Sequence, residues 1–267
     1  ALVKMKTLLE NAAKNNRGIG AFSVGNMEMV KGAIRAAEEV DTPIILQIAE
    51  VRLKHSPLDD GPMMVQAAKS AKVDVAVHLD HGLTFETVQR ALELGFTSVM
   101  LDASTLPFEE NIENQKVVEL AAEYGATVEA ELGLVGGSEE EAVTMVSAVL
   151  TRMSQSIAEK TGIDALAVAI GNAHGNYPVA PKLAFDVLEQ IHNKVDIPLV
   201  LHGAAASRIL ISREQSPLDQ ESKIATASFN CLTKKVEEYI ASEGKHNYFD
   251  LNEAMVQGTY ENVKRHI

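Results

Sequence analysis

Seven short apolar runs rich in Val, Ile and Leu alternate along the chain with longer amphipathic stretches. Continuous apolar runs are typical of strands in a parallel sheet covered by helices, and each amphipathic stretch suits one covering helix. The pattern predicts strands at Gly18–Val24, Pro43–Ala49, Val73–Asp80, Thr97–Ala103, Thr127–Leu132, Leu166–Gly171 and Pro198–His202, with a weakly marked eighth that includes Lys223–Thr226.

Helical patterns occupy the segments between these runs. The expected helices are Met27–Glu39, Gly61–Lys72, Thr84–Gly95, Phe108–Tyr124, Ser154–Thr161, Leu183–Lys194 and Phe229–Ser242, followed by a short helix at Leu251–Arg265. Seven or eight such units favour an α/β fold, a single (β/α)8 TIM barrel over residues 1–267 with a C-terminal helical extension. A dinucleotide-binding fold is second choice, because no Gly-x-Gly-x-x-Gly motif follows the first strand.

Charge and cysteine content exclude several classes of function. The chain has 24 Lys and Arg against 37 Asp and Glu, a net charge of −13, which repels nucleic acids and anionic membranes. One cysteine excludes a disulfide framework and a Cys-rich zinc site. Neither a signal peptide nor a membrane-spanning run is evident, so we expect a cytoplasmic protein that acts on a small molecule.

Three histidines lie at the mouth ends of three predicted strands, and each precedes a glycine: His81, His174 and His202. Active-site groups of parallel barrels lie at the carboxyl ends of the strands. Three imidazoles that leave a fourth position open make a catalytic zinc site. The alternative is that each histidine only caps its strand through a hydrogen bond.

Carboxylates accompany these histidines. Asp80 adjoins His81, so the two side chains point to opposite faces unless the backbone turns there. Asp80 could instead cap a helix or orient an imidazole. Asp102 and Glu131 also end strands and are candidates for a second or alternative metal position. Glu129 shares the face of Glu131, and a carboxylate inside a barrel needs a metal or a donor.

A glycine- and glutamate-rich loop, residues 136–141, follows the fifth predicted strand. Such a charge run is usually only a solvated surface. On a loop above a barrel mouth, a glutamate such as Glu139 can also deliver a general base when the loop closes.

Several ordered motifs together resemble one family. They are HLDHG at 78–82, VEAELG at 128–133, VGG at 135–137, LAVAIG at 166–171, AHG at 173–175 and VLHG at 200–203. In these six motifs the chain resembles the class II (metal-dependent) ketose-bisphosphate aldolases, which act on fructose or tagatose bisphosphates. The resemblance runs from about residue 18 to 203 and again over 223–230.

The resemblance implies a barrel with Zn²⁺ on His81, His174 and His202, and an alternative, more buried metal position at Asp102 and Glu131. Asp80 would exchange the proton of the hydroxyl at the cleaved bond, and Glu139 would be the carbon base. A Na⁺ or K⁺ ion near the phosphate and a homodimer or homotetramer are also implied. The residues expected to bind substrate or phosphate are Gly175, Gly203, Ser207, Thr226 and Asn26.

The resemblance weakens between residues 204 and 226. An asparagine expected in the eighth strand is missing, and Pro217 stands where a helix should run. Ser23 and Ala49 replace the Asn and Ser that are common in the family. Either the segment is truly divergent, with weaker phosphate binding, or the sequence there is locally corrupted, as a compensated frameshift would make it.

The predicted function is reversible cleavage of a ketose 1,6-bisphosphate into dihydroxyacetone phosphate and an aldehyde, through a metal-stabilised enediolate. The main alternative is a paralogue that binds metal and sugar phosphate with little or no turnover. A metal-dependent barrel hydrolase is a remote third option, because the first strand lacks a His-x-His pair.

Overall fold

The computed structural model of this chain describes residues 1–104, 107–108, 114–133, 147–172, 183–203, 221–242 and 244–267. The elements within them are α1 (Met5–Lys14), β1 (Ile19–Ser23), α2 (Met27–Glu39), β2 (Ile44–Ala49), η1 (Glu50–Arg52), η2 (Leu58–Asp60), α3 (Gly61–Ser70), β3 (Val75–Gly82), α4 (Phe85–Glu93), β4 (Ser98–Leu101), α6 (Asn114–Tyr124), β5 (Thr127–Leu132), α7 (Ser147–Thr161), β6 (Ala165–Val168), α8 (Phe185–His192), β7 (Leu199–Leu201), β8 (Glu221–Ile224), α9 (Thr226–Ala241) and α10 (Tyr248–His266).

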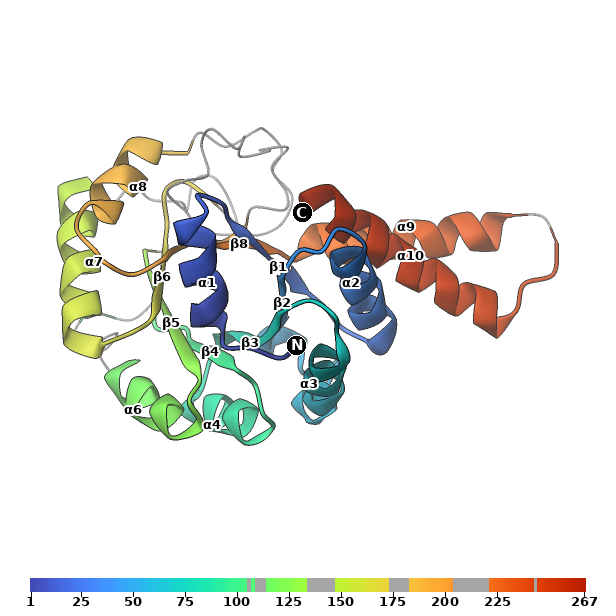
Figure 1. Cartoon of the computed structure of the whole chain (residues 1–267), viewed down its shortest axis with the longest axis horizontal. Coiled ribbons are helices and arrows are strands. Elements are labelled where there is room, and N and C mark those ends of the chain that lie inside the picture. Colours follow the sequence, from blue (N-terminus) through green and yellow to red (C-terminus); the bar gives the residue numbers. More distant parts are fainter. Residues whose placement is uncertain (105–106, 109–113, 134–146, 173–182, 204–220, 243) are drawn as a thin grey trace.

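The strands form one curled parallel sheet. They pair in chain order from β1 to β8, and β8 pairs in parallel with β1. Figure 1 shows helices α2, α3, α4, α6, α7 and α8 around the outside of this sheet, as right-handed crossovers between parallel neighbours require. The predicted α/β class with a parallel sheet is confirmed. All strands end at the same rim, called here the carboxyl-end rim.

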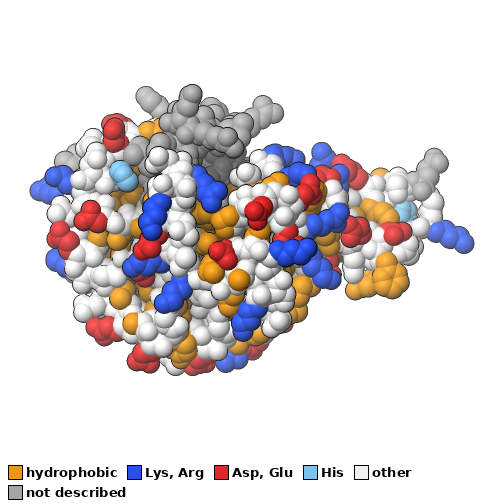
Figure 2. Space-filling view, viewed as in Figure 1, with side chains coloured by type: hydrophobic (Ala, Val, Ile, Leu, Met, Phe, Trp, Pro, Cys, Tyr) orange, Lys and Arg blue, Asp and Glu red, His pale blue; other side chains and the backbone are white. Residues whose placement is uncertain are grey.

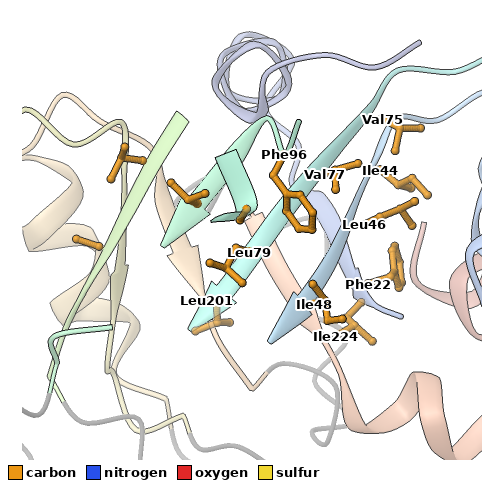
Figure 3. Packing of buried hydrophobic residues seen from close by; sticks show 14 of the residues in the cluster. Phe22, Ile44, Leu46, Ile48, Val75, Val77, Leu79, Phe96, Leu201 and Ile224 are labelled. Carbon is orange, nitrogen blue, oxygen red and sulfur yellow. The ribbon is translucent and has the colours of Figure 1, made fainter. Parts of the chain in front are cut away.

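The outward faces of the strands carry the larger hydrophobic core. On β2, the outward residues are Ile44, Leu46 and Ile48, and β3 contributes Val75, Val77 and Leu79 at the same spacing of two. Figure 3 shows these side chains on one side of their strands, with Phe96 packed among them. The core fixes which face of each strand turns inward, because a shift of one residue would expose it.

Helix α1 closes the inner space near the amino ends of the strands, and Figure 1 shows it in the middle of the ring of strands. Its buried side chains pack against small inward residues of the sheet. The members of this inner cluster are Met5, Leu8, Leu9, Ala12, Ile19, Ala21, Ile45, Ala76, Ala165, Ala167 and Val200. The sequence analysis did not predict α1, because its role as a plug is a tertiary property.

The inner face becomes polar toward the carboxyl-end rim. Along β2 the inward residue after Ile45 is Gln47, and along β3 the residues after Ala76 are His78 and Asp80. Further buried polar residues of this inner face are Ser23, Ser98, Glu129, Glu131 and His202. Polar groups inside the barrel therefore gather at the end where active sites of such folds lie.

The last two helices form a hairpin that extends beyond the sheet (Figure 1). Helix α10 packs closely on α2, where a Cβ added to Gly32 would lie 2.4 Å from the Val256 carbonyl oxygen. Asn247 caps α10 by accepting hydrogen bonds from the Phe249 and Asp250 amides, so this helix begins three residues before the predicted Leu251. No helix among the described residues is both long and apolar enough to span a membrane.

The plug helix gives the first prediction. Replacing Leu9, which is fully buried against the inner strands, by alanine should destabilise the protein by about 2–5 kcal/mol, because a cavity forms in a space that cannot collapse. Urea unfolding followed by circular dichroism measures the loss. The exposed neighbour Glu10 serves as control, and Glu10→Ala should change stability by less than about 0.5 kcal/mol. Equal effects of the two substitutions would show that α1 is not a structural plug.

Candidate metal-binding and catalytic site

The end of β3 places two adjacent ionisable residues on the same side of the chain. His81 adopts φ of 46°, in the left-handed region that non-glycine residues rarely occupy. The pairing of β3 with β4 also shifts register between Leu79 and Gly82. Because the backbone turns here, Asp80 and His81 face each other, with Asp80 Oδ1 3.8 Å from His81 Nε2. Such local strain is typical of functional sites.

His202, directly after β7, lies beside this turn. Its ring centroid is 4.7 Å from that of His81, at an interplanar angle of 82°. Its Nδ1 atom lies 3.0 Å from Glu131 Oε2, on the inner face of β5. Glu131 Oε2 is also 3.8 Å from His81 Nδ1. Strands far apart in sequence therefore bring two imidazoles and a carboxylate to one point.

Two overlapping groups in the described part of the chain have a geometry that could hold a metal ion. One consists of Asp80, His81 and His202, and the other of His81, Asp102 and Glu131. In each group the candidate ligand atoms lie within 4.8 Å of one another. Two ligand atoms on one tetrahedral Zn²⁺ stand about 3.3 Å apart, and imidazole nitrogen and carboxylate oxygen are both zinc ligands. The donor set therefore fits a divalent ion of this kind.

Asp102 is hydrogen-bonded to His81 and to Ser104, two residues along the chain. His81 Nδ1 lies 2.7 Å from Asp102 Oδ2, while the Ser104 hydroxyl and amide donate to Oδ1 at 2.7 and 3.1 Å. Burial alone raises the pKa of the Asp102 carboxyl, but the hydrogen bonds from His81 and Ser104 outweigh it and hold the pKa well below its ordinary value. Asp102 is therefore an anion throughout the neutral range.

The Asp80 carboxylate accepts a hydrogen bond from a buried side chain of β2. Gln47 Nε2 donates to Asp80 Oδ2 at 3.0 Å and to Ser23 Oγ at 3.1 Å, and all three side chains are buried. This leaves Asp80 Oδ1 facing His81 at the rim. The sequence analysis did not single out Gln47, although a lone polar residue within the apolar run Pro43–Ala49 was a usable signal.

Arg52 is a second residue that the sequence analysis missed. It ends η1, just beyond β2, and its guanidinium carbon lies 3.9 Å from the centre of the Phe229 ring. Burial lowers the pKa of Arg52, and the nearby Asp80 carboxylate raises it. Its guanidinium makes no hydrogen bond or ion pair with residues that the structure describes, which leaves its N–H groups for an anionic ligand.

The remaining predicted residues are distributed as follows. Glu139, His174, Gly175 and Ser207 lie outside the described residues. Gly203 follows β7 with φ of 66°, a turn that favours glycine. Thr226 opens α9, and Asn26 caps α2 by accepting from the Met29 amide at 2.9 Å. The structure thus brings together Asp80, His81, His202, Asp102 and Glu131.

The low pKa of Asp102 predicts how stability depends on pH. Because the pKa is lower in the folded state, its contribution is complete above the unfolded value near 3.8 and is lost as pH falls through the folded value. Asp102→Asn should lower the stability of the chelator-treated protein at pH 7 by about 1–3 kcal/mol. The difference from wild type should shrink below about pH 4.

Urea unfolding from pH 3 to 8 tests this dependence. Asp59, an exposed carboxylate paired with Arg90, is the matched control, and Asp59→Asn should cost about 1 kcal/mol or less at every pH. A constant difference between Asp102→Asn and wild type down to pH 3 would contradict the assignment.

Known proteins resemble this chain over most of its length. The family model of class-II fructose-bisphosphate aldolase matches residues 3–266. A fructose-bisphosphate aldolase of Staphylococcus aureus (strain Mu50) is 42% identical over 208 residues, which cover 76% of this chain and 73% of the relative.

Solved structures agree with this match. The YdjI aldolase of Escherichia coli K12 has a TM-score of 0.83 at 29% identity, covering 99% of this chain and 95% of that one. A candidate fructose-1,6-bisphosphate aldolase from Coccidioides immitis has a TM-score of 0.86 at 27% identity, covering 98% and 94%. The predicted enzyme class, an aldolase lyase, is confirmed, and the chain belongs to the class-II fructose-bisphosphate aldolase family.

Proposed function

We propose that this chain is a zinc-dependent aldolase that reversibly cleaves a ketose 1,6-bisphosphate, of fructose or tagatose, into dihydroxyacetone phosphate and an aldehyde. The observation that carries the proposal is the group of Asp80, His81 and His202 at the carboxyl-end rim, in a chain of this family. The name of the Staphylococcus aureus relative makes fructose 1,6-bisphosphate the first substrate to test.

His81 and His202, together with His174 outside the described residues, would hold the ion. When bound, Zn²⁺ supplies a Lewis acid that draws charge from the ketone oxygen of the substrate. Asp102 and Glu131 would form a deeper, alternative position, because they share His81 with the first group. A Na⁺ or K⁺ ion beside the phosphate is proposed from the family resemblance.

Asp80 is proposed to move the proton at the cleaved bond. In the cleavage direction its carboxylate takes the proton of the hydroxyl as the carbon–carbon bond breaks and the aldehyde carbonyl forms. The bonding electrons stay on the carbon next to the ketone, where Glu139 would deliver a proton. The hydrogen bond from Gln47 to Asp80 Oδ2 supports this role, since it leaves Oδ1 directed toward the rim.

Phosphate binding is proposed at Gly203, Thr226 and Asn26, and at Gly175 and Ser207 outside the described residues. Thr226 is the first residue of α9, and the residue before it, Ala225, supplies no side-chain cap, so the N–H groups at this helix end favour an anion. Arg52 adds a positive charge at the same rim. These local donors would bind a phosphate that the net charge of −13 repels at long range.

The assembly and architecture are proposed as follows. The strand order supports a complete (β/α)8 barrel, in one domain over residues 1–267, with α9 and α10 as its helical extension.

Tyr248 and Phe249, 68% and 80% exposed at the outer end of the α9–α10 hairpin, favour a homodimer or homotetramer. Figure 2 shows hydrophobic side chains there. The lack of a disulfide framework supports a cytoplasmic location.

Metal removal tests the proposed function. Dialysis against a chelator should abolish cleavage of fructose 1,6-bisphosphate, and added Zn²⁺ should restore it. Borohydride with substrate should leave activity unchanged, because no Schiff base forms. Cleavage that survives complete metal removal would refute the proposal. Bound zinc and measurable sugar-phosphate affinity without turnover on either bisphosphate would favour the paralogue without aldolase activity.

Asp80→Asn tests the proton-transfer role. It should lower kcat about 10²–10⁴-fold, because general acid–base catalysis by one group contributes this much. The zinc content of the variant must match wild type, so that a lost ligand is not mistaken for lost chemistry. Asp59→Asn, at an exposed surface position, should keep wild-type kcat. An unchanged kcat in zinc-loaded Asp80→Asn would exclude Asp80 from this role.

A further inference from the structure

A line of buried polar side chains continues below the candidate metal site, into the interior of the barrel. His202 Nε2 lies 2.9 Å from Glu129 Oε1, and Glu129 Oε2 lies 3.6 Å from His78 Nε2. His78 Nδ1 lies 2.7 Å from Ser98 Oγ, whose hydroxyl donates to the sulfur of Met5 at 3.3 Å. These five residues are all fully buried, and Met5 belongs to the plug helix α1.

Burying this line of polar side chains lowers the stability of the fold, so we expect the line to have a function. The inner positions just below are occupied by small apolar residues, such as Ala76 and Ala165, which pack without unmet hydrogen bonds. A carboxylate and two imidazoles in the same interior must all be paired, because burying an unpaired charge is strongly unfavourable. An apolar residue at position 129 would avoid this cost altogether.

The contact with Glu129 determines how His202 presents its ring. A carboxylate oxygen only accepts, so the Nε2–H group of His202 donates to Glu129 Oε1. A neutral imidazole that carries its proton on Nε2 has its lone pair on Nδ1. That nitrogen faces Glu131, 3.0 Å away, at the point where His81 also converges. Glu129 therefore orients the nitrogen of His202 that can bind a metal.

Glu129 itself is not placed as a ligand. Neither metal-binding group found among the described residues includes it, and its second oxygen faces His78, away from the rim. Glu129 and Glu131 project to the same inner face of β5, two residues apart, with Glu131 nearer the carboxyl-end rim.

We propose that Glu129 is a positioning residue that fixes the tautomer and ring orientation of His202 for metal binding. The second oxygen of Glu129 faces His78, and Ser98 and Met5 continue this line of contacts to the plug helix. The inference rests on the proposed metal-dependent function and deepens it. Carboxylate partners of this kind typically account for 10–100-fold in metal affinity.

Zinc affinity, measured by competition with a chelating dye on the full-length protein, tests the inference independently of activity. Glu129→Leu should weaken zinc binding about 10–100-fold. Glu129→Gln should lose less, because its amide oxygen can still accept from His202. With Co²⁺ in place of zinc, the visible absorption bands of Glu129→Leu should shift, since the ligand field changes with the orientation of the ring.

Asn262 offers a matched control outside this line of contacts. It is fully buried in α10 and donates to Ser228 Oγ at 3.1 Å. Asn262→Leu should lower stability, yet it should leave zinc affinity and the Co²⁺ bands at wild-type values. Equal zinc affinity in wild type and folded Glu129→Leu, with unchanged Co²⁺ bands, would overturn the inference.

If Glu129→Leu does not fold, Glu129→Gln decides between the outcomes. Weakened zinc binding in Glu129→Gln supports the inference, and wild-type zinc affinity overturns it. A wild-type protein that binds zinc without cleaving a ketose bisphosphate would refute the proposed function alone. A wild-type protein that binds no zinc would refute both.

Discussion

Pairing between carboxylates and imidazoles inside the barrel is the constraint on which the site depends. Glu129 and Glu131 both project into a space from which the outer helices and the plug helix exclude water. Neither can be buried alone, because desolvation of an unpaired carboxylate is too costly. His202 lies between them, with one ring nitrogen toward each. The position of this ring is therefore set by its hydrogen bond to Glu129 as well as by packing.

The barrel interior is divided into an apolar layer and a polar layer, and this division makes the pairing compatible with a stable fold. Near the amino ends of the strands, α1 and small inward residues form an apolar layer. The larger core between strands and helices is also apolar, as Figure 3 shows. The polar groups thus lie between the rim and this apolar layer, on strands whose register the surrounding cores hold fixed. A site built on such strands is positioned more precisely than one built on loops.

Local features of this site could be predicted from the sequence, whereas contacts between distant strands could not. The spacing of two along Thr127–Leu132 correctly predicted that Glu129 and Glu131 share a face, since both carboxylates contact His202. The same rule predicted opposite faces for Asp80 and His81 unless the backbone turned, and only the structure shows the turn at His81. Helix α1 escaped prediction because its burial depends on a barrel that forms around it. The partners of His78 and Gln47 come from distant strands, so no sequence spacing could reveal them.

The two candidate metal groups share His81, which restricts how an ion would be held. A neutral imidazole has one lone pair, so His81 can bind an ion through only one nitrogen at a time. When Asp102 accepts the proton of Nδ1, the lone pair of Nε2 is directed toward Asp80, at the rim. An ion held by Asp102 and Glu131 would instead take Nδ1 and remove that hydrogen bond. The anionic Asp102 therefore favours the position beside Asp80, the residue proposed to move the proton at the cleaved bond.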